Sequence, residues 1–229
     1  MIPWEVLDTA TIPGGSETLR LKRRGGEFSI MLGTNELMNS RLSGSEEALA
    51  RLSIERLTGE AAKAPRVLIG GLGMGFTLRA ALPLLPPSAA VTVAELVPAV
   101  IAWARGPLAA LFAGSLDDAC VSVREGDVGA VMKEAAVPQG RRFDAILLDV
   151  DNGPEGLSRA GNDALYDARG LATARAALAP GGILSVWSSG PNAGFTRRLK
   201  QAGFTVEEIT VRAGRTKRGA RHVIWLGRR

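Results

Sequence analysis

The chain has 229 residues, of which 46% are hydrophobic and 22% charged, and this length suits one large α/β domain with a small extension. No apolar run reaches the ~18 residues of a membrane span. One cysteine, Cys120, excludes an intrachain disulfide, and the N-terminus lacks the basic and apolar regions of a signal peptide, so we expect a cytoplasmic protein with no membrane partner. The net charge of +5 is local, because seven of the 28 Lys and Arg and none of the 23 Asp and Glu lie between Arg212 and Arg229, which argues against a general polyanion-binding surface.

Residues 1–43 are predicted to form a small N-terminal β region that packs on the main domain, which spans 44–229. Residues 18–23 and 27–32 alternate apolar and polar side chains, as half-buried strands do. Gly25-Gly26 and Gly33-Thr34-Asn35 supply turn signals, so we expect two hairpin turns. The apolar set of this region is too small for it to fold alone.

A helix is predicted to begin at Ser45-Glu46-Glu47. Serine is a favourable helix cap, and acidic residues in the first turn complement the helix dipole. Leu49, Leu52 and Leu57 follow at helical spacing, and Gly59 ends the pattern.

The next unit is a strand, a glycine turn, a helix and a second strand, between residues 66 and 95. Gly71, Gly73 and Gly75 follow the apolar run 67–69, and the second strand ends on Glu95. Glycines keep the backbone at a helix start open to a ligand, and an acid about 20 residues later suits ribose hydroxyls. The G-x-G-x-G spacing is typical of S-adenosylmethionine-binding folds rather than of NAD-binding ones. The alternative, a tight structural turn, explains the glycines but not the acid, and Glu95 has no evident capping role.

Further strands alternate with helices along the rest of the chain. They are expected at 120–123, 143–149, 183–187, 204–211 and 222–226. This alternation predicts a Rossmann-like, mostly parallel seven-stranded sheet with helices on both faces, of the class I methyltransferase type. No helix separates the last two strands, so one of them must run antiparallel. The basic turn between them is either solvated or, less favoured, a nucleic-acid contact made by Arg212, Arg215, Lys217, Arg218 and Arg221.

Acidic side chains follow the third and fourth strands of the predicted sheet. Asp127 ends the third strand, where a nucleoside contact and a cap for the next helix are equally good interpretations. Asp149 ends the fourth, and Asp151, Glu155, Asp163 and Asp167 follow it within nineteen residues. Such a loop would attract a cationic substrate, and a carboxylate there could deprotonate an amine. The alternative is a solvated loop of turn-forming residues.

Other catalytic chemistries lack support in the sequence. The one histidine, His222, has no metal-binding partner pattern, and no G-x-S-x-G elbow is present. We therefore expect no metal. Trp187 and Trp225 are interpreted as core or pocket-wall residues.

The motifs VLIGGLGMG, AELVPAV, GDV, AILLDVDNGPEG and LYDARGLATARAALAPGGIL, in this order, resemble the spermidine synthase family. The resemblance implies a class I methyltransferase-type core and decarboxylated S-adenosylmethionine as donor. It places the donor's nucleoside on the glycine turn, on the second-strand acid and on the Gly-Asp after strand three. The implied donor-binding residues are Gly71, Gly73, Met74, Gly75, Glu95, Leu96, Asp127 and Val128.

The same resemblance makes Asp149 the acid that deprotonates the attacking amine, and it implies acceptor contacts from Asp151, Asn152 and Glu155. The chain departs from the family in two places. Asn152 stands where the family has a second acid, and Leu49-Ala50-Arg51 where it has a Tyr-His/Gln-Glu set. The resemblance thus favours a transferase with an S-adenosyl-type donor and a cationic small-molecule acceptor.

Three alternatives stay open at this point. Decarboxylated S-adenosylmethionine would donate an aminopropyl group, whereas S-adenosylmethionine would donate a methyl group to an unknown substrate. A non-catalytic relative could have kept only the nucleoside pocket. The oligomeric state is also open, with a homodimer as one option.

Overall fold

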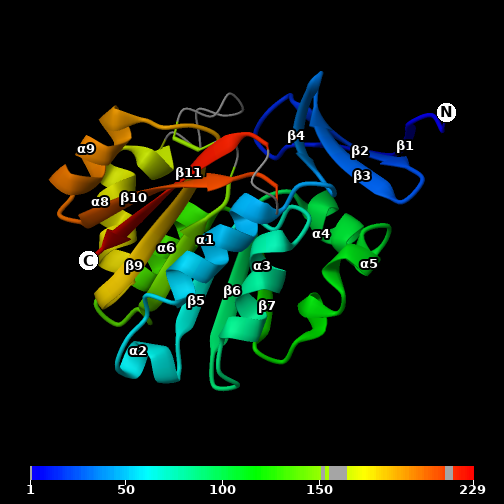
Figure 1. Cartoon of the computed structure of the whole chain (residues 1–229). Coiled ribbons are helices and arrows are strands. Elements are labelled where there is room, and N and C mark those ends of the chain that lie inside the picture. Colours follow the sequence, from blue (N-terminus) through cyan, green and yellow to red (C-terminus); the bar gives the residue numbers. More distant parts are fainter. Residues whose placement is uncertain (1, 151–152, 155–163, 215–218) are drawn as a thin grey trace.

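The computed structural model describes residues 2–150, 153–154, 164–214 and 219–229. Its centre is a sheet of strand order β10-β11-β9-β8-β5-β6-β7 (Figure 1). Neighbours from β9 to β7 run parallel, and β11 runs antiparallel to both β9 and β10. The predicted fold class and the single antiparallel strand are confirmed. The strands are β5 (Arg66–Gly70), β6 (Ala90–Glu95), β7 (Val121–Glu125), β8 (Phe143–Leu148), β9 (Leu178–Ser188), β10 (Thr205–Arg212) and β11 (Arg221–Arg228).

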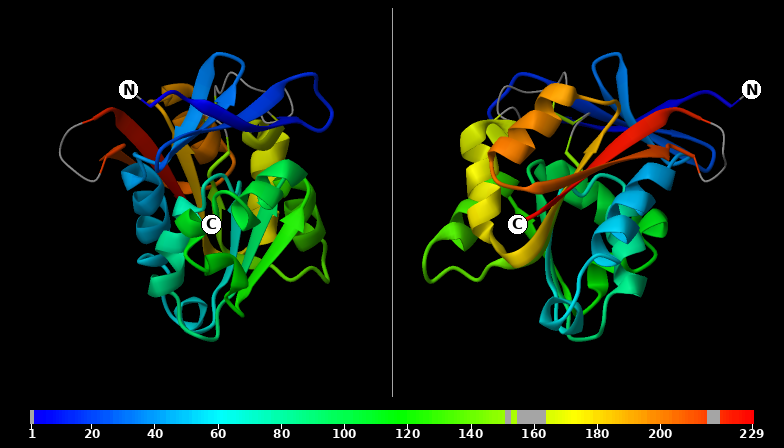
Figure 2. Two further views of the ribbon diagram at one scale, coloured as in Figure 1. Left: turned by 90° about the vertical axis from the view of Figure 1, so that its right-hand side faces the viewer. Right: turned by 60° about the vertical axis from the view of Figure 1, so that its left-hand side comes forward.

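Helices cover both faces of this sheet (Figure 2). Helices α1 (Gly44–Ile54), α3 (Phe76–Ala81) and α4 (Pro98–Arg105) bury apolar side chains in one core, and α6 (Val128–Ala136), α8 (Ala168–Ala177) and α9 (Ala193–Gln201) in the other. Strand β8 supplies both cores, because successive side chains point to opposite faces. The short elements are α2 (Glu60–Lys63), α5 (Ala109–Phe112) and the 3₁₀ turns Leu82–Leu84 and Ser115–Asp117.

The N-terminal region is a four-stranded antiparallel sheet in the order β1-β2-β3-β4. Its strands are β1 (Glu5–Thr11), β2 (Thr18–Arg24), β3 (Glu27–Leu32) and β4 (Asn35–Asn39). The pairing of β2, β3 and β4 agrees with the two predicted turns. Strand β1 was not predicted, because it lies at the sheet edge, is largely exposed and has an irregular register between Val6 and Asp8.

The N-terminal sheet shares its core with the main domain. Leu21 and Ile30 belong to the same buried cluster as Leu78 and Val100. The indole N–H of Trp103 also donates to Asp8 Oδ2 over 2.6 Å, which ties α4 to β1. The small sheet is therefore packed on the main domain, as its composition predicted.

Helix α1 begins earlier than predicted. Its N-cap is Ser43, which makes no side-chain bond to the backbone, and Ser45 lies inside the first turn with no exposed surface. The start is fixed by the Gly44 N–H, which donates to the Ala213 carbonyl over 2.8 Å. A Cβ at Gly44 would lie 2.7 Å from the backbone of Gly214, so this contact needs glycine. Ser45 is thereby free to bond to other side chains.

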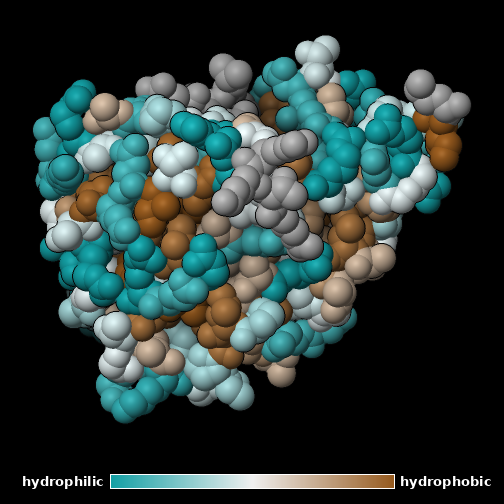
Figure 3. All heavy atoms as spheres, viewed as in Figure 1, coloured by the Kyte–Doolittle hydropathy of each residue, from teal (hydrophilic) through white to brown (hydrophobic). Residues whose placement is uncertain are grey.

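Polar residues cover most of the molecular face seen in Figure 3, with apolar patches between them. In the described part of the chain, no helix combines the length and apolar character that crossing a membrane requires.

Candidate functional site

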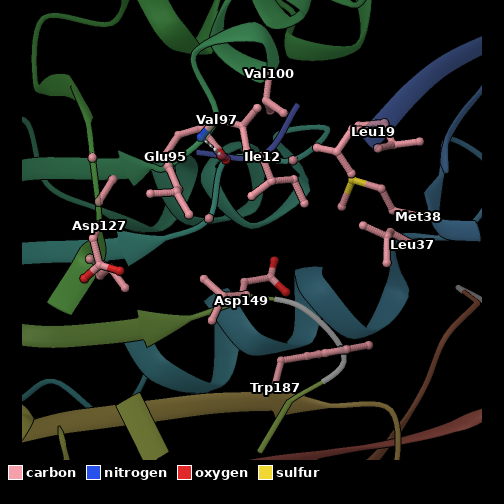
Figure 4. Close-up of a pocket in the computed structure, with 18 of the residues that line it drawn as sticks. Ile12, Leu19, Leu37, Met38, Glu95, Val97, Val100, Asp127, Asp149 and Trp187 are labelled. Atoms are coloured by element: carbon pink, nitrogen blue, oxygen red, sulfur yellow. Dashed lines mark hydrogen bonds between the residues drawn. The ribbon is translucent and has the colours of Figure 1, made fainter. Parts of the chain in front are cut away.

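A cavity lies where the carboxyl ends of the parallel strands meet the N-terminal sheet (Figure 4). Its floor carries the glycine turn and residues after β6, β7 and β8. Its opposite wall is apolar and comes from the N-terminal sheet, which was expected to pack on the domain but not to line a site. These wall residues are Ile12, Leu19, Ile30, Leu37 and Met38. Trp187, at the end of β9, completes the cavity as the predicted pocket-wall residue.

The glycines of the turn are required by contacts within the protein. Gly71, Gly73 and Gly75 have φ angles of 92°, 50° and 77°, which side chains rarely adopt. A Cβ at Gly71 would lie 2.4 Å from the Asp149 carbonyl, and one at Gly73 would lie 2.5 Å from Met38 Cε. From the sequence, this space was expected to be open to a ligand, but protein atoms occupy much of it. Gly71 and Gly73 still line the cavity.

Met74 and Gly75 are placed differently from the other predicted donor-binding residues. The Met74 side chain is completely buried in the core, and neither residue is among those that line the cavity. A Cβ at Gly75 would lie 2.4 Å from Phe112, so this glycine serves the packing of α5.

Glu95 is a buried acid at the end of β6 that lines the cavity. Its Oε2 accepts from the Leu72 N–H over 2.9 Å and its Oε1 from the Val97 N–H over 2.8 Å. Burial raises the pKa of Glu95, and the backbone N–H groups around it partly oppose this shift. Glu95 was expected to have no evident capping role; its carboxylate binds the backbone N–H of Val97, the residue that precedes the first turn of α4. Glu95 holds the glycine turn and the start of α4 together.

Asp127 is a helix cap, one of the two interpretations that the sequence left open, and the nucleoside contact stays a prediction. Its carboxylate accepts from the Ala130 N–H over 3.1 Å and so caps α6. It also lines the cavity, as do Leu96 and Val128. The cap leaves a second carboxylate oxygen for another partner.

Asp149 follows β8 directly and faces the cavity (Figure 4). The Thr77 hydroxyl donates to its Oδ2 over 2.5 Å. Burial, followed by the negative charge of Glu46, raises the pKa of Asp149 to about 7, while the Thr77 hydrogen bond lowers it. A carboxyl group with this pKa is half ionised near neutral pH, which suits a general base. The predicted acceptor residues Asp151, Asn152 and Glu155 lie outside the described residues.

Glu46 is the acid that sequence reasoning missed. It was interpreted as a first-turn residue of α1, yet it lines the cavity and its charge acts on Asp149. Burial raises its own pKa, and the Ser45 hydroxyl donates to its Oε2 over 2.6 Å. The sequence signal that could have identified it is the pair of adjacent acids Glu46-Glu47, because only one of two neighbouring helix residues can face the cavity.

The ionisable side chains that line the cavity are all acidic among the described residues. Its ionisable lining residues, among those described, are Glu46, Glu95, Asp127 and Asp149, without a Lys, Arg or His. Such a lining favours cations and disfavours carboxylates. In the same part of the chain, no group of three His, Cys, Asp or Glu is arranged to hold a metal.

The raised pKa of Asp149 predicts a pH-dependent stability. Unfolded Asp loses its proton near ~3.9, whereas the folded carboxyl keeps it up to about 7. The folded state thus binds more protons in this window, so the free energy of unfolding should fall as pH rises from about 4 to about 7, by up to ~4 kcal/mol. Denaturant unfolding of the free protein at about pH 5 and pH 7.5 tests this. Asp149→Asn should make the dependence shallower without abolishing it, because burial also raises the pKa values of Glu46 and Glu95. An unchanged slope in that variant would contradict the assignment.

The chain resembles known transferases in sequence and in fold. The chain is 38% identical over 126 residues to a polyamine aminopropyltransferase from Mycobacterium tuberculosis, and a protein of that name from Mycobacterium bovis gives the same values. The match covers 55% of this chain and 23% of the relative, so the chain spans about a quarter of those proteins. No protein-family model matches the chain.

Solved structures show the same fold. A spermidine synthase from Thermotoga maritima has a TM-score of 0.72 at 17% identity, covering 97% of this chain and 72% of that one. A probable spermidine synthase from Corynebacterium glutamicum reaches 0.63 at 16% identity, with 98% and 80% covered. The O-methyltransferase TomG from Streptomyces achromogenes, in complex with SAM, reaches 0.54 at 18% identity, with 80% and 78% covered. The predicted likeness to the spermidine synthase family on a methyltransferase-type fold is confirmed, and the relatives are transferases.

Proposed function

We propose that the chain is a spermidine synthase-like transferase, which moves the aminopropyl group of decarboxylated S-adenosylmethionine to a cationic amine. The observation that carries this proposal is the cavity lined by four carboxyl groups and, among the described residues, no basic side chain. The sequence match to polyamine aminopropyltransferases and the shared fold support it.

The charge of the cavity favours decarboxylated S-adenosylmethionine over S-adenosylmethionine, the two donors that the sequence left open. S-adenosylmethionine carries an α-carboxylate that its decarboxylated form lacks. A carboxylate about 4 Å from a buried acid is disfavoured by roughly 4 kcal/mol at an effective dielectric constant of ~20. Backbone N–H groups of the glycine turn could offset part of this cost, but two neighbouring ones, at Leu72 and Val97, already donate to Glu95. The donor's free ammonium group meets no such penalty.

We assign the nucleoside to the floor of the cavity. Glu95, Asp127 and the backbone at Gly71 and Gly73 line it, together with Leu96 and Val128. Met74 and Gly75 would then act indirectly, by fixing the shape of the turn. Asp149 would face the acceptor, and we extend the acceptor site to Asp151, Asn152 and Glu155, as the resemblance implies.

The reaction requires one proton to leave the acceptor. Asp149 takes it from the acceptor ammonium, and the neutral amine attacks the methylene carbon bound to the sulfonium. The C–N bond forms as the C–S bond breaks, and its electron pair goes to sulfur, which leaves as a neutral thioether nucleoside. The net products are the extended ammonium, methylthioadenosine and one proton.

Titration calorimetry with three ligands tests the proposal. We expect decarboxylated S-adenosylmethionine to bind at least about tenfold more tightly than S-adenosylmethionine, given the charge penalty. Methylthioadenosine should also bind, since it shares the nucleoside. Tighter binding of S-adenosylmethionine would favour methyl transfer, and binding of none of the three would refute a nucleoside site.

A second function, a non-catalytic nucleoside-binding relative, is favoured by one feature of α1. Where the family has a Tyr-His/Gln-Glu set, Leu49 and Ala50 are completely buried in the core. Donor binding without a thioether product across a panel of amines would support this alternative.

The remaining assignments are proposals of the same kind. We propose that residues 1–43 close the site over a nucleoside-binding unit formed by 44–229. The cytoplasmic location and the homodimer stay predictions. A nucleic-acid contact is not proposed, since Arg215, Lys217 and Arg218 lie outside the described residues and Arg212 donates to the Gly219 carbonyl.

A further inference from the structure

A series of hydrogen-bonded side chains leads from the cavity to a half-buried histidine on β11, the second strand of the sheet. Glu46 lines the cavity, and the Ser45 hydroxyl donates to its Oε2 over 2.6 Å. His222, in β11, places Nδ1 2.9 Å from the same hydroxyl. Ser45 has no exposed surface, whereas His222 is half-buried. The three residues thus connect a carboxyl group that lines the cavity to a half-buried imidazole ring.

We propose that Glu46 is a second carboxylate of the acceptor site, and that Glu46, Ser45 and His222 form the route by which the acceptor's proton leaves the cavity. This inference rests on the proposed function, because the proton is the one that the amine loses before it attacks. The role of Asp149 as the first base is unchanged.

The local charges explain why a second carboxylate is useful here. Glu46 and Asp149 line one cavity, and Glu46 makes no ion pair with the described part of the chain. Among the described residues, the titratable groups near Glu46 are Asp149 after β8, Glu47 on its own helix and, through Ser45, His222. Two acids with no counter-ion favour one shared proton or a bound cation. An acceptor ammonium supplies the cation, and after its deprotonation the pair keeps the proton.

The hydrogen-bond geometry allows the proton to move onward. While Glu46 is ionised, Ser45 donates to it and accepts from the Nδ1–H of His222. Once Glu46 is protonated, its O–H donates to Ser45, whose own hydrogen passes to Nδ1 of the other imidazole tautomer. The imidazolium then releases its Nε2 proton to water, which leaves a neutral ring with its Nδ1–H and returns Glu46 to its ionised form. Burial lowers the pKa of His222, so the ring is neutral and can accept at neutral pH.

The fold holds this series in place. Trp187 lines the cavity and packs edge-on against His222, with ring centroids 4.8 Å apart at 81°. Helix α1 is fixed against β9 by the buried hydroxyls of Ser53 and Ser185, which lie 2.6 Å apart. Together with the contact of Gly44 with the backbone at Ala213, this bond holds the helix that carries Glu46 in place.

A double-mutant cycle tests the route. Ser45→Ala and His222→Gln should each lower the kcat of donor-saturated enzyme about tenfold near neutral pH, and the double variant should lose no more than either, because the members act as one unit. Raising the pH should restore the rate, whereas a structural defect would persist. Methylthioadenosine affinity and the unfolding midpoint should stay near wild type. The proposal would be overturned if the single variants kept the wild-type kcat, or if the loss of kcat in the double variant equalled the product of the two single losses.

A second measurement keeps the proposal separate from the proposed function. In ¹³C NMR of the carboxyl groups, Glu46→Gln should lower the pKa of Asp149, because a negative neighbour is removed. Glu55→Gln, at the C-cap of the same helix, is the matched control, since Glu55 forms an exposed ion pair with Arg51, and it should leave the titration unchanged. An unchanged Asp149 titration in Glu46→Gln would overturn the shared site even if no amine is turned over. If Glu46→Gln does shift the Asp149 titration but no amine is turned over, the shared site would stand and only the proposed transferase activity would be refuted.

Discussion

Asp149→Asn should lower the kcat of donor-saturated enzyme by roughly 10²–10⁴, the usual contribution of a general base. The amide keeps the shape of the side chain, and its oxygen can still accept from the Thr77 hydroxyl. It cannot take a proton from the acceptor ammonium. Donor affinity should change by less than about threefold, because we assign the nucleoside to the neighbouring strand ends.

The pH dependence of the rate gives an independent test of the same residue. Asp149 must be ionised to act, and its pKa is raised to about 7. The kcat of wild-type enzyme should therefore rise with pH through this value and then level off, and Asp149→Asn should lose this limb.

Asp144→Asn provides a matched control for this variant. Asp144 lies on β8 at the end remote from the cavity, where it accepts from the Arg66 N–H over 2.8 Å. The amide oxygen can keep that bond, so the rate should stay near wild type. If Asp149→Asn abolished donor binding and left the rate of saturated enzyme intact, Asp149 would belong to the donor site and the proposed mechanism would be wrong.

The alternation of apolar runs with helical segments was sufficient to predict the main sheet and the strand ends that form the floor of the site. Parallel strands end at one edge, so Glu95, Asp127 and Asp149 had to converge if the strands were correctly placed. Strand β1 was not predicted because its sequence, EVLDTAT, shows no regular alternation of apolar and polar residues, and because few of its side chains are buried at the edge of the sheet.

Side-chain roles that depend on tertiary contacts could not be predicted in the same way. From the sequence, Glu46 and Glu47 are equivalent acids of a helix start. The contact of Gly44 with the backbone near Ala213 fixes the rotation of α1 that turns Glu46 toward Asp149. In the same way, the G-x-G-x-G pattern showed that side chains are excluded, but it did not show that Met38, Phe112 and the Asp149 carbonyl exclude them.

The second prediction of large effect concerns Glu95, and it combines affinity with stability. If Glu95 accepts hydrogen bonds from the donor's ribose, its loss should cost about 1.5–3 kcal/mol and weaken donor binding roughly 10- to 100-fold. Glu95→Ala also leaves the N–H groups of Leu72 and Val97 without their carboxylate partner, which should lower the unfolding free energy by about 1–3 kcal/mol for each group left unsatisfied.

Glu95→Gln separates the two contributions. The amide oxygen can still accept from one of the two N–H groups, so stability should recover in part, while the charge-assisted contact to ribose stays lost. Calorimetry with methylthioadenosine measures the affinity, and denaturant unfolding measures the stability. The kcat at saturating donor should stay near wild type in Glu95→Gln, since the residue holds the nucleoside and not the reacting atoms.

Glu125→Gln is the control, because Glu125 pairs with Glu95 in register on β7 but is exposed and does not line the cavity. Full donor affinity in Glu95→Gln would show that Glu95 serves only the two backbone turns, and the nucleoside would then have to be assigned elsewhere on the floor of the cavity.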